Sequence, residues 1–128
     1  MTGSPLTPFP TGDTKYSTDL GMESLHAAMI SHNDNHHVWV TEFGFSTCAP
    51  AGGLCVTEAQ QSQWLAESFK MMARLPFVTV VLSYNARNND ARTDVWNNNF
   101  GMMRFALSAK PSLTAVSQTW SCLHAGTC

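Results

Sequence analysis

The stretch His37-Val38-Trp39-Val40-Thr41-Glu42-Phe43-Gly44-Phe45 decides the fold of this chain. Its alternating β-branched and aromatic residues are typical of a strand in a buried sheet. We expect the strand to end near Glu42, where the following glycine permits a sharp turn. In barrels of parallel strands, the chemistry lies at the C-terminal ends of the strands. Glu42 is therefore either a catalytic residue or a carboxylate at the end of a strand that accepts a hydrogen bond from a loop.

Three helices are expected around this strand. An aspartate can cap the first helix, over residues 19–31. Thr57 begins the second helix, Gln60 is placed to complete a capping box, and Pro76 ends it. A proline suits the first position of a last helix over residues 112–120. Each of these boundaries follows from local chemistry alone.

A second strand is expected over residues 77–84, where the apolar run is nearly continuous. Such runs suit strands that are covered on both faces, as in parallel sheets. Strands separated by full helices imply right-handed parallel crossovers. Two parallel strands alone bury little surface and leave open edges. We therefore predict that residues 1–128 form a single segment of a larger closed structure, with an irregular loop over 1–18, βα units over 19–120 and a tail over 121–128.

Composition narrows the classes of partner. A hydrophobic fraction of 44% and a charged fraction of 12% indicate a globular protein. The net charge of −2, without a basic cluster, predicts no nucleic-acid partner. No apolar run approaches the roughly 20 residues that span a bilayer, so no membrane partner is expected. The first residues also lack the features of a signal peptide.

The four cysteines fall into two close pairs, Cys48 with Cys55 and Cys122 with Cys128. Each pair could close a small loop by a disulfide, which would stabilise the fold by roughly 2–3 kcal/mol. Four cysteines allow three connectivities, among which we favour local pairing. Zinc binding is the rival interpretation, although the spacing does not suit it. Disulfides would indicate an oxidising compartment.

Three motifs resemble one enzyme superfamily. Trp39-Val40-Thr41-Glu42-Phe43-Gly44 resembles the seventh-strand motif of clan-A glycoside hydrolases, the (β/α)8 superfamily of cellulases, mannanases and β-xylosidases. Ser83-Tyr84-Asn85-Ala86-Arg87-Asn88 resembles the end of their eighth strand. Asn99-Phe100-Gly101-Met102-Met103-Arg104, with Lys110-Pro111, resembles their closing segment. The resemblance implies an α/β fold, a partial TIM (β/α)8 barrel with its seventh strand at 38–42 and its eighth at 78–84.

The resemblance also implies a reaction. Glu42 matches the catalytic nucleophile of retaining enzymes, which attacks the anomeric carbon and forms a covalent intermediate. A retaining mechanism needs a second carboxylate about 5–5.5 Å away. The family takes it from a glutamate after an asparagine on the fourth strand, which this chain lacks. Asp90 and Asp94 could stand on the same barrel face, but the family does not use that position. No cofactor is implied.

Four residues are candidates for substrate binding. Trp96, in the polar loop after the second strand, is the best aromatic for a contact with a sugar at the rim. Asn85 and Arg87 could bind sugar hydroxyls or tie down the loop. Many relatives carry a tryptophan platform at the position of Ser83, and Tyr84 beside it could stack on a sugar. Strand alternation would, however, point Tyr84 the other way.

Other residues have simpler interpretations. His32 and His36 have a spacing that suits metal binding on a helix, but they lie in a turn, so we expect a solvated loop and no metal. Trp39, Trp64 and Trp120 are expected in the core. No phosphate-binding glycine loop, nucleophile elbow or Cys–His pattern is present.

Three functions follow for testing. The first is a fragment of a retaining glycoside hydrolase that acts on a poly- or oligosaccharide once the missing barrel portion completes it. The second is a non-catalytic carbohydrate-binding module derived from the same fold. The third is a small structural domain stabilised by disulfides. The resemblance and the cysteines together predict an extracellular location.

Overall fold

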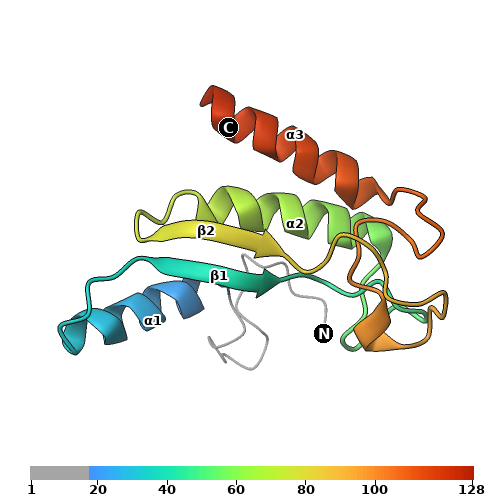
Figure 1. The fold of residues 1–128 in the computed structure, drawn as a ribbon, viewed down its shortest axis with the longest axis horizontal. Coiled ribbons are helices and arrows are strands. Elements are labelled where there is room, and N and C mark those ends of the chain that lie inside the picture. The colour runs from blue at the N-terminus through green and yellow to red at the C-terminus, as the bar shows by residue number, and fades with distance from the viewer. Residues whose placement is uncertain (1–17) are drawn as a thin grey trace.

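The computed structural model describes residues 18–128, so most of the loop expected over 1–18 lies outside the described residues. Helices and strands alternate in the predicted order (Figure 1). The structure has a small mixed α/β fold with a two-stranded sheet. The elements are α1 (Thr18–Ser31), β1 (Val38–Phe43), α2 (Glu58–Met72), β2 (Val78–Ser83), the 3₁₀ turn η2 (Trp96–Asn98) and α3 (Pro111–Ala125).

The predicted starts of α2 and α3 are right, whereas α1 begins at Thr18, one residue before the aspartate that was expected to cap it. The capping box before α2 is formed, because the Gln60 amide donates to the Thr57 hydroxyl at 3.1 Å and Gln60 Oε1 accepts the Thr57 amide at 2.9 Å. The helix ends at Met72, ahead of Pro76. Helix α3 continues to Ala125, so most of the expected tail is helical, and Gly126 ends the helix in the left-handed region.

The two strands are parallel and α2 connects them, as predicted. Val38 pairs with Val78 and Val40 with Val81, and the register is irregular between Val40 and Phe43. Helix α2 contacts both α1 and α3. Figure 1 shows the helices in chain order, from α1 below β1 to α3 at the top. Both strands therefore end at the same edge of the sheet.

The core lies mainly on α2, where Trp64, Leu65 and Met72 are buried. The prediction for Trp64 is thus confirmed. Those for Trp39 and Trp120 are wrong, because their side chains are 66% and 63% exposed. Trp39 lies on β1 and Trp120 on α3, and within the described residues too little packs on either ring to bury it.

Local disulfide pairing is confirmed. Cys48 is bonded to Cys55 and Cys122 to Cys128, and the two Cα atoms are 5.2 Å apart in each pair. The four cysteines are therefore joined in two disulfides, and the hypothesis that they bind zinc is wrong. No helix within residues 18–128 combines the length and apolar character needed to cross a membrane.

A buried polar network holds the polar loop after β2 against α2 and α3. Gln61 Nε2 donates to the Phe45 carbonyl at 2.8 Å and to the Phe100 carbonyl at 3.2 Å. Its Oε1 accepts the Ser112 hydroxyl at 2.8 Å. Buried polar groups are stabilising when they are satisfied in this way. The network therefore fixes the loop on which part of the candidate site lies.

Lys110 is the buried cation of this region. Its ammonium donates to Thr47 Oγ1 at 2.7 Å, Asn88 Oδ1 at 2.9 Å and the Asn99 carbonyl at 3.2 Å. Burial lowers the pKa of Lys110 to about 8, while the nearby Glu58 carboxylate opposes this shift and Arg104 adds to it.

The free energy of unfolding should rise with pH from about 8 to 10.5. Below pH 8 the amine is protonated in both states, so the cost of burying its charge is fully present. Between the two pKa values the unfolded chain binds more protons than the folded chain, and deprotonation of the folded amine relieves that cost. Urea denaturation at several pH values should show the rise, and Lys110→Met should remove it. An equal rise in both proteins would contradict the assignment.

Candidate active site

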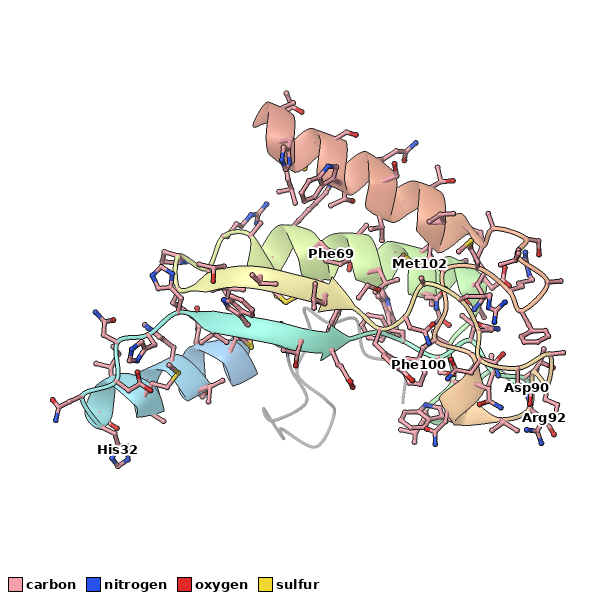
Figure 2. The ribbon with its side chains drawn as sticks, in the orientation of Figure 1. His32, Phe69, Asp90, Arg92, Phe100 and Met102 are labelled. Atoms are coloured by element: carbon pink, nitrogen blue, oxygen red, sulfur yellow. A yellow bond between two sulfur atoms is a disulfide. The ribbon has the colours of Figure 1, made fainter. Side chains whose placement is uncertain are left out.

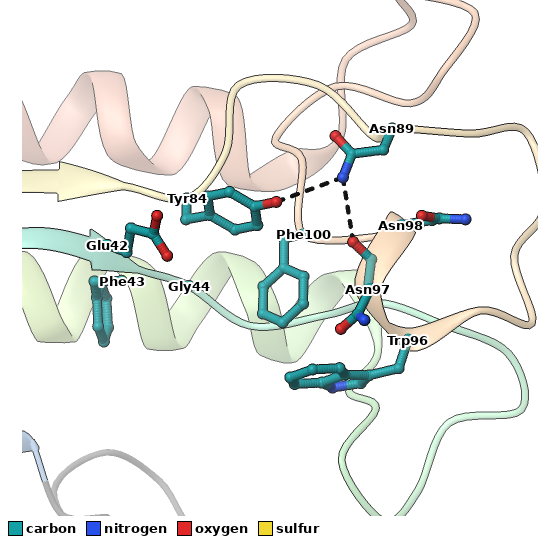
Figure 3. Close-up of a pocket in the computed structure, with 9 residues that line it drawn as sticks. All are labelled: Glu42, Phe43, Gly44, Tyr84, Asn89, Trp96, Asn97, Asn98 and Phe100. Carbon is teal, nitrogen blue, oxygen red and sulfur yellow. Dashed lines mark hydrogen bonds between the residues drawn. The ribbon is translucent and has the colours of Figure 1, made fainter.

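A cavity of about 460 Å³ opens at the edge of the sheet where both strands end. It contains one carboxylate, several amide side chains and aromatic rings (Figure 3). The lining residues are Glu42, Phe43, Gly44, Tyr84, Asn89, Trp96, Asn97, Asn98 and Phe100. The structure thus brings together three of the five site residues predicted from the sequence, Glu42, Tyr84 and Trp96.

Glu42 is the next-to-last residue of β1, because the strand continues to Phe43, one residue beyond its predicted end. Its side chain is exposed, whereas that of Phe43 packs by its edge against Phe45 and Phe69. Figure 3 shows the Glu42 carboxylate on the side of the Tyr84 ring and Phe43 pointing the opposite way. The alternation of the strand therefore places the carboxylate in the cavity and anchors its neighbour on α2.

Gly44 lets the ends of the two strands approach. A Cβ atom on Gly44 would lie 2.0 Å from the Tyr84 carbonyl oxygen and 3.3 Å from the Phe100 ring. The Tyr84 amide donates to the Phe43 carbonyl at 2.7 Å, just beyond the regular pairing. The glycine after Glu42 is thus required by the space available, and it brings Tyr84 close to the carboxylate.

Tyr84 lines the cavity, so the prediction that it would point away is wrong. Strand β2 ends at Ser83, and alternation no longer governs the residue that follows. The Tyr84 ring packs edge-on against Phe100 at 5.6 Å between centroids, and its hydroxyl accepts Asn89 Nδ2 at 3.5 Å.

Trp96 forms the outer part of the cavity, on η2. Its side chain is 42% exposed, and its ring packs edge-on against Phe100 at 5.0 Å. Its indole N–H donates to the Leu54 carbonyl at 3.1 Å. An aromatic face that is held in place and still open to solvent suits stacking on the apolar face of a sugar.

Three asparagines of the cavity were not predicted from the sequence. Asn89, Asn97 and Asn98 all line it, and Asn89 Nδ2 also donates to the Asn97 carbonyl at 3.3 Å (Figure 3). Amides both donate and accept hydrogen bonds, as sugar hydroxyls require. The only sequence signal for these residues is that this loop is rich in asparagine. Asparagine is also common in ordinary turns, so this signal does not identify a binding site.

Asn85 and Arg87 do not line the cavity. Asn85 Nδ2 donates to Asn89 Oδ1 at 3.0 Å, so it contacts a residue that does. The Arg87 guanidinium lies over the Phe105 ring, 5.0 Å from its centroid. Of the two roles considered for these residues, fixing the loop agrees better with these contacts than direct binding of a sugar.

Asp90 and Asp94 also lie outside the residues that line the cavity. Asp90 pairs with Arg92 at 2.6 Å, and Figure 2 shows the two side by side in the loop. The hydrogen bond from the Arg92 side chain holds the pKa of Asp90 below its ordinary value. A general acid needs a raised pKa, so Asp90 is unsuited to that role. The structure brings neither residue to Glu42.

The histidines of the turn after α1 are exposed, and His36 pairs with Asp34. Figure 2 shows His32 on the outside of this turn. Within residues 18–128, no three side chains of the metal-binding types come together.

Solved structures similar to this chain are glycoside hydrolases. A family 39 glycoside hydrolase from the gut symbiont Bacteroides cellulosilyticus WH2 is 29% identical, with a TM-score of 0.61, over 73% of this chain and 18% of its own. The β-glucuronidase of Ruminococcus gnavus, in complex with uronic isofagomine, is 18% identical with a TM-score of 0.62, over 84% and 19%. The β-D-glucuronidase of Dictyoglomus thermophilum is 19% identical with a TM-score of 0.58, over 77% and 18%.

No protein-family model and no curated protein matches the chain. The chain spans less than a fifth of the length of each of these three structures. The fold is therefore similar to one part of several glycoside hydrolases, and its extent is consistent with a partial barrel.

Proposed function

We propose that this chain is one part of a retaining glycoside hydrolase that cleaves β-glycosidic bonds in poly- or oligosaccharides. Its contribution is the nucleophile, Glu42, and one wall of the sugar site. The observation that carries the proposal is the position of Glu42 at the end of β1, in one cavity with Tyr84 and Trp96. The similarity to the family 39 enzyme supports it.

The chemistry assigns separate tasks to the residues of the cavity. Glu42 attacks the anomeric carbon, the leaving oxygen departs, and water later hydrolyses the glycosyl ester. Trp96 and Tyr84 offer aromatic faces to the sugar ring, and the amides of Asn89 and Asn97 bind its hydroxyls. The acid/base carboxylate comes from the missing barrel portion, which must place it about 5–5.5 Å from Glu42.

The missing barrel portion is the partner of this chain, in the same polypeptide or as a separate one. Strands β1 and β2 pair only with each other within the described residues. An apolar groove of about 540 Å³ runs between β2, α2 and α3, and Val81, Leu113, Val116 and Trp120 contribute to it. Further parallel strands and helices would cover these surfaces. The two disulfides support an extracellular location for the assembly.

A specific observation favours a second function, that of a non-catalytic carbohydrate-binding module. Of the nine residues that line the cavity, Glu42 is the only carboxylate. A module of this kind would bind oligosaccharides without completion by other strands, and the replacement of Glu42 would change only its affinity.

A chimaera tests the proposal. In it, this chain replaces the matched segment of the Bacteroides family 39 enzyme, and aryl β-glycosides report turnover. We expect turnover by the chimaera and none by the isolated chain, because one carboxylate cannot perform both steps. A chimaera that folds, as judged by circular dichroism, but is inactive while the isolated chain binds oligosaccharides would favour the second function.

A further inference from the structure

The loop between Cys48 and Cys55 is held by its disulfide and by its own backbone. The Gly52 amide donates to the Cys55 carbonyl at 2.8 Å, and the Cys55 amide donates to the Gly52 carbonyl at 2.9 Å. Gly52 and Gly53 both have positive φ angles, 131° and 60°. Glycine is the most flexible residue of an open chain, so closing the loop with the disulfide removes much of its conformational freedom.

This loop contacts Trp96 through its backbone. The Leu54 carbonyl accepts the indole N–H of Trp96 at 3.1 Å, across 42 positions of sequence. The side chain of Leu54 is 72% exposed, so the carbonyl makes the directional contact. The Trp96 ring is thus held on one side by its edge contact with Phe100 and at its N–H by this one oxygen atom of the loop.

The ends of the loop fix the backbone that carries Trp96. The Ala49 amide donates to the Thr93 carbonyl at 2.6 Å. On the other side, the buried hydroxyl of Ser46 donates to the Trp96 carbonyl at 2.7 Å, and the Val56 amide donates to the Ser46 carbonyl at 2.8 Å. Both the ring and the main chain of Trp96 are therefore held by segment 46–56.

We propose that the loop closed by Cys48 and Cys55 is a positioning element for Trp96, which fixes the aromatic face at the rim of the sugar site. The link to sugar affinity rests on the proposed function, whereas the position of the ring can be measured without any sugar. Opening the disulfide frees the Leu54 carbonyl to move, and the partly exposed indole N–H then exchanges its protein partner for water. The ring then keeps its contact with Phe100 but loses the hydrogen bond that fixes its orientation, and a sugar that stacks on it must restore that orientation.

The first test is structural and uses the full chain. The indole N–H groups of the four tryptophans are observed by NMR, and Trp96→Phe identifies the signal of Trp96. In the Cys48→Ser/Cys55→Ser variant, we expect the Trp96 signal to shift and its hydrogen exchange to accelerate at least tenfold. The matched control, Cys122→Ser/Cys128→Ser, removes the disulfide at the end of α3 and should leave that signal unchanged. An unchanged Trp96 signal in the first variant overturns the proposal.

Trp96→Phe gives a second measurement that does not require loss of a disulfide. It keeps an aromatic ring but removes the donor to the Leu54 carbonyl. We expect the Kd for cellohexaose, xylohexaose or mannohexaose, whichever binds the native chain, to rise three- to tenfold in Trp96→Phe and in the Cys48→Ser/Cys55→Ser variant. Combining the two changes should add little, because both remove the same contact. Fully additive losses would overturn the coupling.

The two proposals fail in different ways. If opening the disulfide moves the Trp96 signal but neither Trp96→Ala nor Trp96→Phe alters sugar affinity, the positioning role stands and the sugar-binding role of Trp96 is wrong. If sugar affinity falls in Trp96→Ala but opening the disulfide leaves the Trp96 signal unchanged, Trp96 binds sugar and the positioning role of the loop is wrong.

Discussion

Replacing Glu42 by glutamine in the completed barrel should lower the turnover of aryl β-glycosides by at least about 10³-fold. Glutamine keeps the shape of the side chain but cannot form the glycosyl ester, because its neutral amide is a poor nucleophile. Glu42 is exposed at the end of β1, so the exchange should not disturb the core. The rate of release of the aryl group, measured at saturating substrate, gives the effect.

Two further variants make this result specific. Asp94→Asn removes another exposed carboxylate, outside the residues that line the cavity, and should retain the native rate. Glu42→Gly opens space for azide, which should restore release of the aryl group by attacking the anomeric carbon in place of the carboxylate. Undiminished turnover in Glu42→Gln would refute the assignment of the nucleophile.

The sequence was sufficient where structure depends on neighbouring residues. The capping box of Thr57 and Gln60 and the position of Glu42 at the end of a strand both follow from a few adjacent positions. Side-chain alternation failed at Tyr84, because the regular strand ends one residue earlier. Burial failed at Trp39, since hydrophobicity predicts burial only where another element supplies the covering surface.

The loop that carries the other side of the cavity is held by contacts between residues far apart in the sequence. Lys110 meets Thr47 across 63 positions and Ser112 meets Gln61 across 51. No local pattern of polar residues specifies such pairs, and a single sequence does not show which asparagine of a polar loop will face a cavity. The Trp96 contact with the Leu54 carbonyl is harder still to foresee, because a backbone oxygen has no identity in the sequence.

These contacts show how the parts of the site depend on one another. The carboxylate comes from the end of one strand, whereas the aromatic rim comes from the loop after the next strand. The two meet because the Tyr84 amide pairs with the Phe43 carbonyl and because Gly44 leaves room for the Tyr84 carbonyl. The close approach at Gly44 is therefore the point at which fold stability and site geometry are most directly coupled.

Gly44→Ala should lower the free energy of unfolding by about 3 kcal/mol, near the upper end of the range for overpacked sites. The added Cβ would lie 2.0 Å from the Tyr84 carbonyl oxygen, a backbone atom that cannot move without breaking the pairing with Phe43. Relief of the clash would push Tyr84 away from Glu42. Urea denaturation of the full chain measures the stability, and the Kd for the bound hexasaccharide should rise in parallel.

Gly53→Ala is the matched control, because it separates steric cost from conformational cost. A Cβ on Gly53 has no atom within 4 Å, yet its φ of 60° disfavours alanine. Only the conformational penalty of about 1 kcal/mol should appear there. At Gly44 the cost is instead the overlap with Tyr84, so Gly44→Ala should be clearly the more destabilising change. Equal losses at the two positions would mean that the strand ends can separate freely, and the coupling between Gly44 and the Glu42–Tyr84 geometry would then be wrong.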